Sequence, residues 1–138
     1  MQIQAVKGQA AFNKVFDKFS QALEANKSEW EFYFTRQDLL NAALLGNNHF
    51  FVGPDISNPV ALVIFQVEKY PTGNVQINVL WSGGEKAEDY VGDFAKVAEM
   101  VAAVEGASRI RCMSCKSLVK QLTDLGYECT QLEMVRTV

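Results

Sequence analysis

The segment from Asn74 to Val104 constrains the fold most, because its pattern predicts a strand, a turn and a long helix in direct succession. Apolar and polar residues alternate from Val75 to Trp81, as they do in a strand with one buried face. From Lys86 to Val104 apolar residues return every three or four positions, which predicts an amphipathic helix. Ser82-Gly83-Gly84, between the two, predicts a turn. Such a turn at a helix N-terminus can present backbone N–H groups to an anion.

Composition indicates one globular domain spanning residues 1–138, with 49% hydrophobic and 21% charged residues. No apolar run reaches the ~18 residues of a membrane span. The first residues lack the basic and apolar regions of a secretory signal. Three cysteines, an odd number, favour a reducing compartment. We therefore expect a soluble, intracellular (cytoplasmic) protein without a membrane span.

The charge pattern argues against a nucleic-acid partner. The net charge is -3, and the basic residues are scattered rather than gathered in a stripe. The densest basic pair is Arg109 and Arg111, which share one predicted strand.

Periodicity and turn residues place the other elements. Strands are expected at Gln2–Val6, Phe50–Gly53, Val60–Glu68, Arg109–Met113 and Tyr127–Val135. Helices are expected over Phe12–Leu23, over Thr35–Leu44 with a capping box of Thr35 and Asp38, and from Ser114 to Leu125 before Gly126. The aromatic run Trp30–Phe34 fits either a short edge strand or a loop packed on the core.

This order predicts an α+β (α/β) fold. Short connections make the three middle strands an antiparallel meander, while Val75–Trp81 and Arg109–Met113, joined by the central helix, should be parallel neighbours. We expect a mixed central sheet of about six to seven strands flanked by about four helices. The predicted core includes Phe16, Phe94, Val97, Val101 and Leu122.

The same order, with Leu125-Gly126-Tyr127-Glu128 after the last helix, resembles the GNAT superfamily of N-acetyltransferases. The resemblance covers nearly the whole chain. It implies that acyl-CoA lies where the strands Val75–Trp81 and Arg109–Met113 separate, with its pyrophosphate on the turn after the first of them. The residues that would then bind acetyl-CoA or CoA are Val79, Trp81, Ser82, Gly83, Gly84 and Glu85.

Three features depart from the family's pattern. The family's phosphate loop reads Gln or Arg, two residues, Gly, one residue, then Gly or Ala. Here Gly83 and Gly84 are adjacent, and no Gln or Arg stands three positions before either. Leu122 stands where the family usually has the tyrosine that acts as its general acid, and Cys115 stands where an asparagine is common. The loop signature and the acid are missing together, which indicates a degenerate member.

Negative charge at the start of the central helix also argues against phosphate binding at the glycine turn. Glu85, Glu88 and Asp89 suit the helix dipole but repel a pyrophosphate at the same end, and only Lys86 opposes them. We therefore interpret the glycine turn as structural rather than as a phosphate cradle.

No general base is evident, because the strand Val75–Trp81 carries no carboxylate. The catalytic candidates are Glu68 and His49, which lie nearest in the chain, and Tyr127. Each is explained more simply as an ordinary core or sheet residue.

Cys112 and Cys115 form a C-x-x-C at a strand-to-helix junction, where a thiol can have a lowered pKa. All three prolines precede the motif, unlike in thioredoxin-like folds. Zinc would need two further ligands, and only Cys129 and His49 remain. We therefore expect reduced structural cysteines and no metal site.

Two main functions stay open. We favour a non-catalytic GNAT-like protein with a degenerate acyl-CoA site that binds a protein partner or joins an assembly. Bacteriophages also encode small degenerate GNAT-like proteins, so a virion component belongs to this hypothesis. The alternative is an acetyl-CoA-dependent N-acyltransferase with an atypical phosphate loop. A thiol redox protein is a distant third.

Overall fold

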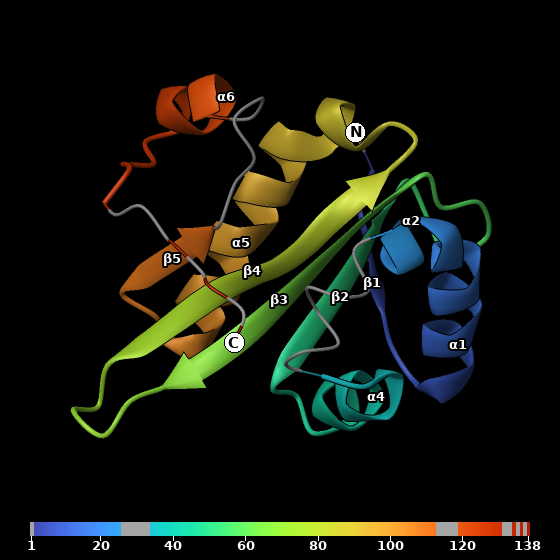
Figure 1. Ribbon diagram of the computed structural model, residues 1–138, viewed down its shortest axis with the longest axis horizontal. Coiled ribbons are helices and arrows are strands. Elements are labelled where there is room, and N and C mark those ends of the chain that lie inside the picture. Colours follow the sequence, from blue (N-terminus) through green and yellow to red (C-terminus); the bar gives the residue numbers. More distant parts are fainter. Residues whose placement is uncertain (1, 26–33, 113–118, 131–133, 135, 137) are drawn as a thin grey trace.

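Figure 1 shows the computed structural model of the chain, which describes residues 2–25, 34–112, 119–130, 134, 136 and 138. The strands are β1 (Gln4–Val6), β2 (Asn48–Gly53), β3 (Ala61–Lys69), β4 (Val75–Gly84) and β5 (Arg109–Cys112). The helices are α1 (Gln9–Lys18), α2 (Ser20–Ala25), α4 (Arg36–Leu44), α5 (Val91–Glu105) and α6 (Val119–Asp124). A 3₁₀ turn, Ala87–Tyr90, leads into α5. Within the described residues, no helix has the length and hydropathy that crossing a membrane requires.

The strands form one mixed sheet in the order β1-β2-β3-β4-β5. Neighbours from β1 to β4 are antiparallel, which confirms the predicted meander. β5 lies parallel to β4, with Arg109 beside Gln76 and Cys112 beside Val79, and α5 connects the two strands. The predicted parallel neighbours are therefore confirmed. The sheet of the described residues has five strands, fewer than the six or seven expected.

The final strand expected over Tyr127–Val135 does not form in residues 127–130, because Tyr127 ends α6 instead. The Tyr127 N–H donates to the Leu122 carbonyl at 3.0 Å, and the Gly126 N–H donates to the Thr123 carbonyl at 3.0 Å. These bonds form a Schellman motif, for which Gly126 supplies the positive φ of 93°. A backbone N–H that caps a helix is not available to a sheet. The other possible strand, Trp30–Phe34, lies outside the described residues except for Phe34.

The capping box predicted at Thr35 and Asp38 is present. The Asp38 N–H donates to Thr35 Oγ1 at 3.1 Å, and the Thr35 N–H donates to Asp38 Oδ2 at 2.9 Å. Because a carboxylate accepts hydrogen bonds best when charged, the Thr35 N–H holds the pKa of Asp38 below its ordinary value.

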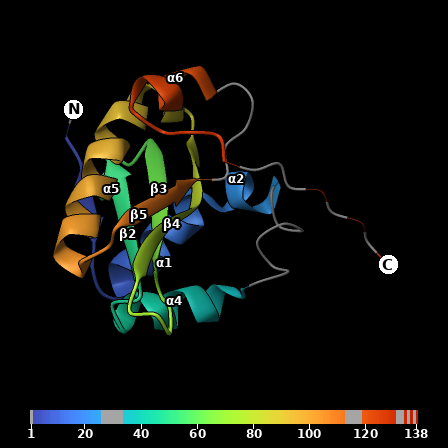
Figure 2. The ribbon, with the colours of Figure 1, turned by 90° about the vertical axis from the view of Figure 1, so that its left-hand side faces the viewer.

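Helices cover both faces of the sheet, with α5 on one side and α1 and α4 on the other (Figure 2). The α1/α4 side buries Phe12, Val15, Phe16, Phe19, Leu23, Leu39, Leu40, Phe50, Val52, Leu62 and Ile64. The α5 side buries Ala61, Val63, Phe65, Ile77, Tyr90, Phe94, Val97, Ala98, Val101 and Ala102. Phe16, Phe94, Val97 and Val101 are therefore buried as predicted. Leu122 is only half-buried, because it borders a cavity rather than the packed core.

β4 continues through Ser82–Gly84, where the sequence predicted a turn. These residues pair with Ala61–Val63 of β3, so the chain turns only at Glu85–Lys86. The predicted helix from Lys86 begins as the 3₁₀ turn and becomes α-helical at Val91.

Close packing explains why the two residues at the end of β4, Gly83 and Gly84, are both glycine. A Cβ on Gly83 would lie 2.5 Å from Cη2 of the Trp81 ring. A Cβ on Gly84 would lie 2.3 Å from the carbonyl oxygen of Val60, and Gly84 also has a φ of 123°. Larger residues are excluded by contacts within the protein, so these glycines need no ligand to account for them.

We predict that Phe94→Ala lowers the free energy of unfolding by ~3–5 kcal/mol, through lost burial and a residual cavity. The ring is only 6% exposed, and its centroid lies 5.7 Å from that of Tyr90. Met100→Ala on the same helix is the control, because Met100 is 65% exposed and should cost less than about 1 kcal/mol. Denaturant titrations measure both. Equal losses would contradict this assignment of the helix faces.

We also predict that Gly84→Ala destabilises the protein by ~1–3 kcal/mol or more, because it combines backbone strain with a steric clash. Gly92→Ala on α5 is the matched control, since its new Cβ would meet nothing within 4 Å. That change should be neutral or stabilise by up to ~1 kcal/mol. Thermal unfolding separates the two variants, and a harmless Gly84→Ala would show that β4 does not pack against Val60.

Candidate functional site

A β-bulge interrupts β4 at Leu80. Phe65 of β3 pairs with Val79 and Ile64 pairs with Trp81, so Leu80 is an extra residue on β4. Leu80 and Trp81 therefore both pack on the α1/α4 side. The sequence alternation predicted Trp81 on the same face of the sheet as Val79. This prediction was wrong, because the bulge turns Trp81 to the opposite face. A bulge also bends its strand and increases the local twist.

The last β4–β5 pair among the described residues lies directly before this bulge. It joins Val79 and Cys112, while β4 continues beside β3 as far as Gly84. Over residues 80–84 the other edge of β4 has no β5 partner in the described part of the chain. Backbone groups on such an edge can hydrogen-bond to an extended ligand.

A cavity of about 250 Å³ opens beside this point, on the α5 side of the sheet. Its lining comes from β3, β4, the 3₁₀ turn, α5, β5, and α6 with the residues that follow it. The lining residues are Val63, Phe65, Val79, Ser82, Ala87, Glu88, Val91, Phe94, Ala95, Ala98, Cys112, Leu122 and Tyr127. Most are apolar. Among those described, the side chains that can exchange a proton are Ser82, Glu88, Cys112 and Tyr127.

Tyr127 is half-buried at this cavity. Burial, and then the negative charges of the Cys112 thiolate and Glu99, raise the pKa of its phenol above the ordinary value. The phenol therefore keeps its proton at neutral pH and can donate it to a developing anion. Sequence reasoning named Tyr127 only as a weak candidate, because its position depends on where α6 packs.

The start of the helical segment carries several negative charges. Glu85, Glu88 and Asp89 are exposed, and Glu88 also lines the cavity. The first N–H groups of any helix have no partner within it and can bind an anion, but these carboxylates oppose that. The structure therefore keeps both features inferred from the sequence at this end of the cavity: N–H groups that can bind an anion, and carboxylates that repel it.

His49 does not reach the cavity. Its Nε2 lies 3.1 Å from Glu105 Oε1, at the C-terminal end of α5. The cavity adjoins the opposite end of this helix, whose 15 residues span about 22 Å. His49 and the cavity are therefore at opposite ends of α5.

Glu68 is also separate from the cavity, because it faces the other side of the sheet. There it accepts a hydrogen bond from the Tyr70 hydroxyl. Of the three catalytic candidates named from the sequence, only Tyr127 lines the cavity.

The predicted C-x-x-C motif is described only at Cys112, which lines the cavity; Cys115 lies outside the described residues. Cys112 and Cys129 form no disulfide. Within the described residues, no group of three His, Cys, Asp or Glu side chains is placed to hold a metal ion.

The sheet face opposite the cavity carries a group of polar residues that sequence reasoning missed. We call it the polar patch, and it comprises Gln66, Glu68, Tyr70, Gln76, Asn78, Arg109 and Arg111. The β3–β4 and β4–β5 registers place these side chains on one face, except that Tyr70 joins from just beyond β3. Gln76 is only 2% exposed. The signal available in the sequence was the alternation of polar residues on these strands.

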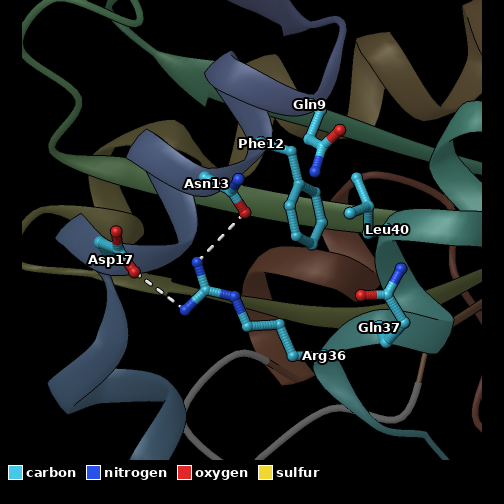
Figure 3. A pocket seen from close by; sticks show the side chains of 7 residues that line it. All are labelled: Gln9, Phe12, Asn13, Asp17, Arg36, Gln37 and Leu40. Atoms are coloured by element: carbon cyan, nitrogen blue, oxygen red, sulfur yellow. Dashed lines mark hydrogen bonds and ion pairs between the residues drawn. The ribbon is translucent and has the colours of Figure 1, made fainter.

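A second, open pocket of about 580 Å³ lies between α1 and α4 (Figure 3). Arg36 reaches across it, with Nη1 2.9 Å from Asp17 Oδ1 and Nη2 donating to Asn13 Oδ1 at 3.3 Å. The Arg36 guanidinium also lies 4.5 Å from the centroid of the Phe16 ring. The Arg36 and Asp17 side chains are 43% and 68% exposed, as in ordinary surface ion pairs. We assign this pocket no chemistry.

No protein-family model matches this sequence, and no curated protein matches it. Solved structures match over nearly its full length. A ribosomal-protein-alanine N-acetyltransferase from Brucella melitensis biovar Abortus 2308 has a TM-score of 0.70 at 13% identity, covering 100% of this chain and 99% of that one. An aminoglycoside acetyltransferase from an uncultured soil metagenomic sample, in complex with sisomicin, has a TM-score of 0.68 at 13% identity, covering 99% and 95%.

An acetyltransferase from Trypanosoma brucei gives a TM-score of 0.66 at 11% identity, covering 99% of each chain. Identities this low establish the fold alone. The predicted resemblance in fold is confirmed: the chain has the α+β fold of the GNAT acetyltransferases.

Proposed function

We propose that this protein is an acetyl-CoA-dependent N-acyltransferase whose acyl donor lies in the cavity beside β4. The observation that carries the proposal is the apolar cavity beside the bulge in β4, lined by both members of the last described β4–β5 pair, Val79 and Cys112. Solved structures of the same fold, matched over nearly the full chain, are acetyltransferases. They support this function better than the non-catalytic hypothesis that the sequence favoured.

The residues present suit the acyl-carrying arm of the donor. Acetyl-CoA supplies an acyl group held as a thioester, which an amine can attack. The edge of β4 over residues 80–84 would hydrogen-bond the amide groups of the arm, as a sheet edge binds an extended peptide. Val79, Phe94 and Ala98 would enclose its apolar parts and exclude water.

The residues present suit the pyrophosphate of the donor less well than they suit its acyl-carrying arm. The N–H groups at the start of the 3₁₀ turn would attract a pyrophosphate, and Lys86 would assist them. Glu85, Glu88 and Asp89 would oppose it. At ~7 Å in water each repulsion is roughly 0.6 kcal/mol per unit charge, so three together weaken binding by about 20-fold. We therefore propose a donor held mainly by its arm.

Tyr127 is the residue that we propose as the general acid. As the amine nitrogen bonds to the acyl carbon, the carbon–sulfur bond breaks and the sulfur gains negative charge. The Tyr127 phenol would give its proton to this sulfur, and the proton lost by the amine would restore the phenol through solvent. The position of the family's tyrosine is Leu122, but Leu122 and Tyr127 line the same cavity. The hydroxyl of Tyr127, five positions after Leu122, would thus serve as the general acid.

One observation favours a second candidate function, a non-catalytic binding protein. Among the described residues that line the cavity there is no histidine, and the single carboxylate, Glu88, stands at the start of the helical segment rather than beside Tyr127. A base for the acceptor amine is therefore not provided by these residues. A bacteriophage origin, a virion role and a protein partner remain predictions.

We predict micromolar binding of acetyl-CoA by calorimetry, and tighter binding when Glu85→Gln, Glu88→Gln and Asp89→Asn are combined. The gain should approach ~20-fold at low salt and shrink at high salt, where charges are screened. Asp17→Asn on α1 is the control, because it removes a carboxylate from the other side of the sheet and should change nothing. No heat at millimolar acetyl-CoA would refute the proposed function.

We predict that Tyr127→Phe lowers kcat by ~100-fold or more while leaving the affinity for acetyl-CoA unchanged. Burial raises the pKa of the Tyr127 phenol above its ordinary value, so the phenol stays protonated near neutral pH. Deprotonation of Tyr127 should therefore cause no loss of wild-type activity between pH 7 and about 9. An alkaline limb within that range that disappears in Tyr127→Phe would contradict the raised pKa.

A further inference from the structure

The cavity beside β4 holds a nucleophile that the proposed acyl transfer does not use, the thiol of Cys112. Cys112 lines the cavity and pairs with Val79, which lines it too. Two residues earlier on β5, Ile110 points to the same face of the sheet and packs against the core beneath α5. The Cys112 side chain is half-buried and forms no disulfide. The sheet therefore holds a thiol in the wall of the cavity.

Hydrogen bonds within the polar patch keep Cys112 in this position. Arg109 Nε donates to Gln76 Oε1 at 2.5 Å, which joins β5 to β4. Gln76 Nε2 donates in turn to Asn78 Oδ1 at 2.6 Å, and Asn78 Nδ2 donates to Gln66 Oε1 of β3 at 3.0 Å. A slip of β5 by one residue would break the bond from Arg109 and take a partner from the buried Gln76 amide. The network therefore fixes the β4–β5 register, and with it the place of Cys112 at the cavity.

Cys112 is also a neighbour of Tyr127, the residue proposed as the general acid. Burial raises the pKa of the Tyr127 phenol most, and the negative charge of the Cys112 thiolate raises it further, so the sulfur and the phenol lie within electrostatic reach. A general acid must come within about 2.6–3.2 Å of the atom that it protonates, which here is the CoA sulfur. A CoA sulfur at Tyr127 would therefore share a cavity of about 250 Å³ with the Cys112 thiol.

Two sulfurs held in one cavity are placed for thiol–disulfide exchange. In this reaction a thiolate attacks a disulfide, bonds to one of its sulfurs and releases the other as a thiolate. Its rate depends on access to the attacking thiol, and binding of the reagent beside that thiol raises the rate further. Cys129 offers a comparison within the same chain, because it is exposed and is not among the described residues that line the cavity. Of these two cysteines, only Cys112 would gain from binding of CoA.

We propose that Cys112 is a modification site for CoA disulfide, and that the mixed disulfide formed there closes the cavity to acetyl-CoA. The inference rests on the proposed acyltransferase function and adds a redox control to the same site. The Cys112 thiolate attacks one sulfur of CoA disulfide, a bond forms between Cys112 and that CoA, and the sulfur–sulfur bond of the reagent breaks. The second CoA leaves as a thiolate and takes up the proton that Cys112 lost. CoA disulfide is thus the oxidant, and no other is required.

The adduct would block the donor site directly, because the attached CoA occupies the space that acetyl-CoA needs. Its arm would lie along the edge of β4 over residues 80–84, and its sulfur would stand beside Tyr127 without an acyl group to transfer. A reducing thiol attacks the same disulfide and restores Cys112. The modification would therefore stop acyl transfer when CoA disulfide accumulates, and it would reverse when reducing thiols return.

The test treats the whole protein with CoA disulfide and follows the adduct by intact-mass and peptide mass spectrometry. Cys112 should gain one CoA at least about tenfold faster than Cys129, because binding holds the reagent at the cavity. Acetyl-CoA at about 100 times its Kd should slow labelling of Cys112 by roughly 100-fold and leave labelling of Cys129 unchanged. Acetyl-CoA binding, measured by calorimetry, should be lost on labelling and should return after dithiothreitol is added.

A second reagent and two matched variants serve as controls. Glutathione disulfide carries out the same exchange without the nucleotide and arm of CoA, so it should label Cys129 at least as fast as Cys112. Acetyl-CoA binding by Cys112→Ala should be the same before and after treatment with CoA disulfide. Cys129→Ala should still lose this binding on treatment. The labelling rates in the native protein need neither variant, so they test the inference even if one variant fails to fold.

The outcomes separate this inference from the function beneath it. Acetyl-CoA binding by the untreated protein without preferential labelling of Cys112 overturns the inference but leaves the acyltransferase function in place. Faster labelling of Cys115 or Cys129 overturns it as well, and so does labelling of Cys112 that acetyl-CoA does not slow. No binding of acetyl-CoA by the untreated protein overturns both.

Discussion

The extra residue in β4 at Leu80 is the constraint on which the rest of the site depends. Before the bulge, β4 has a strand on each side; after it, β4 remains paired only with β3 in the described chain. The bulge turns Trp81 toward α1 and α4, and it restores Ser82 to the α5 side. A bulge bends its strand and increases the local twist, and the cavity lies directly beside this bend in β4.

The end of β4 is held by packing on both of its faces. Gly84 lies against the Val60 carbonyl, and the Trp81 ring lies over Gly83. On the other face the Tyr90 and Phe94 rings form a tilted aromatic pair in the core beneath α5. Gly84 adopts its φ of 123° without the strain of about 1–3 kcal/mol that a residue with a Cβ would have there. The core therefore supports the site without needing a bound ligand to form it.

Local signals in the sequence predicted most of the fold. The alternation in β4 as far as Val79, the apolar face of α5 and the capping box of Thr35 and Asp38 depend on residues close together in the chain, and all three were predicted correctly. The bulge gave no such signal, since Leu80 and Trp81 are both apolar and fit either face. Gly83 and Gly84 indicated a turn, yet the contacts that require them lie partly on another strand.

The candidate site was less predictable, because it depends on contacts between distant segments. His49 was named for its chemistry, but its partner, Glu105, lies 56 positions away and at the wrong end of α5. Tyr127 was named for its place in the helix ending, and the Schellman motif that fixes its backbone also explains why it leaves the sheet. The polar patch needed the register of three strands before its members came together.

The two faces of the sheet beside the bulge have opposite characters. The cavity side is apolar, with carboxylates at its outer end, so it suits a ligand that contributes apolar surface and disfavours added negative charge. The patch side is polar, and its amides cannot rearrange without losing hydrogen bonds. Asn78 of this network and Val79 of the cavity lining are neighbours on β4, so one strand carries the polar network on one face and the wall of the cavity on the other.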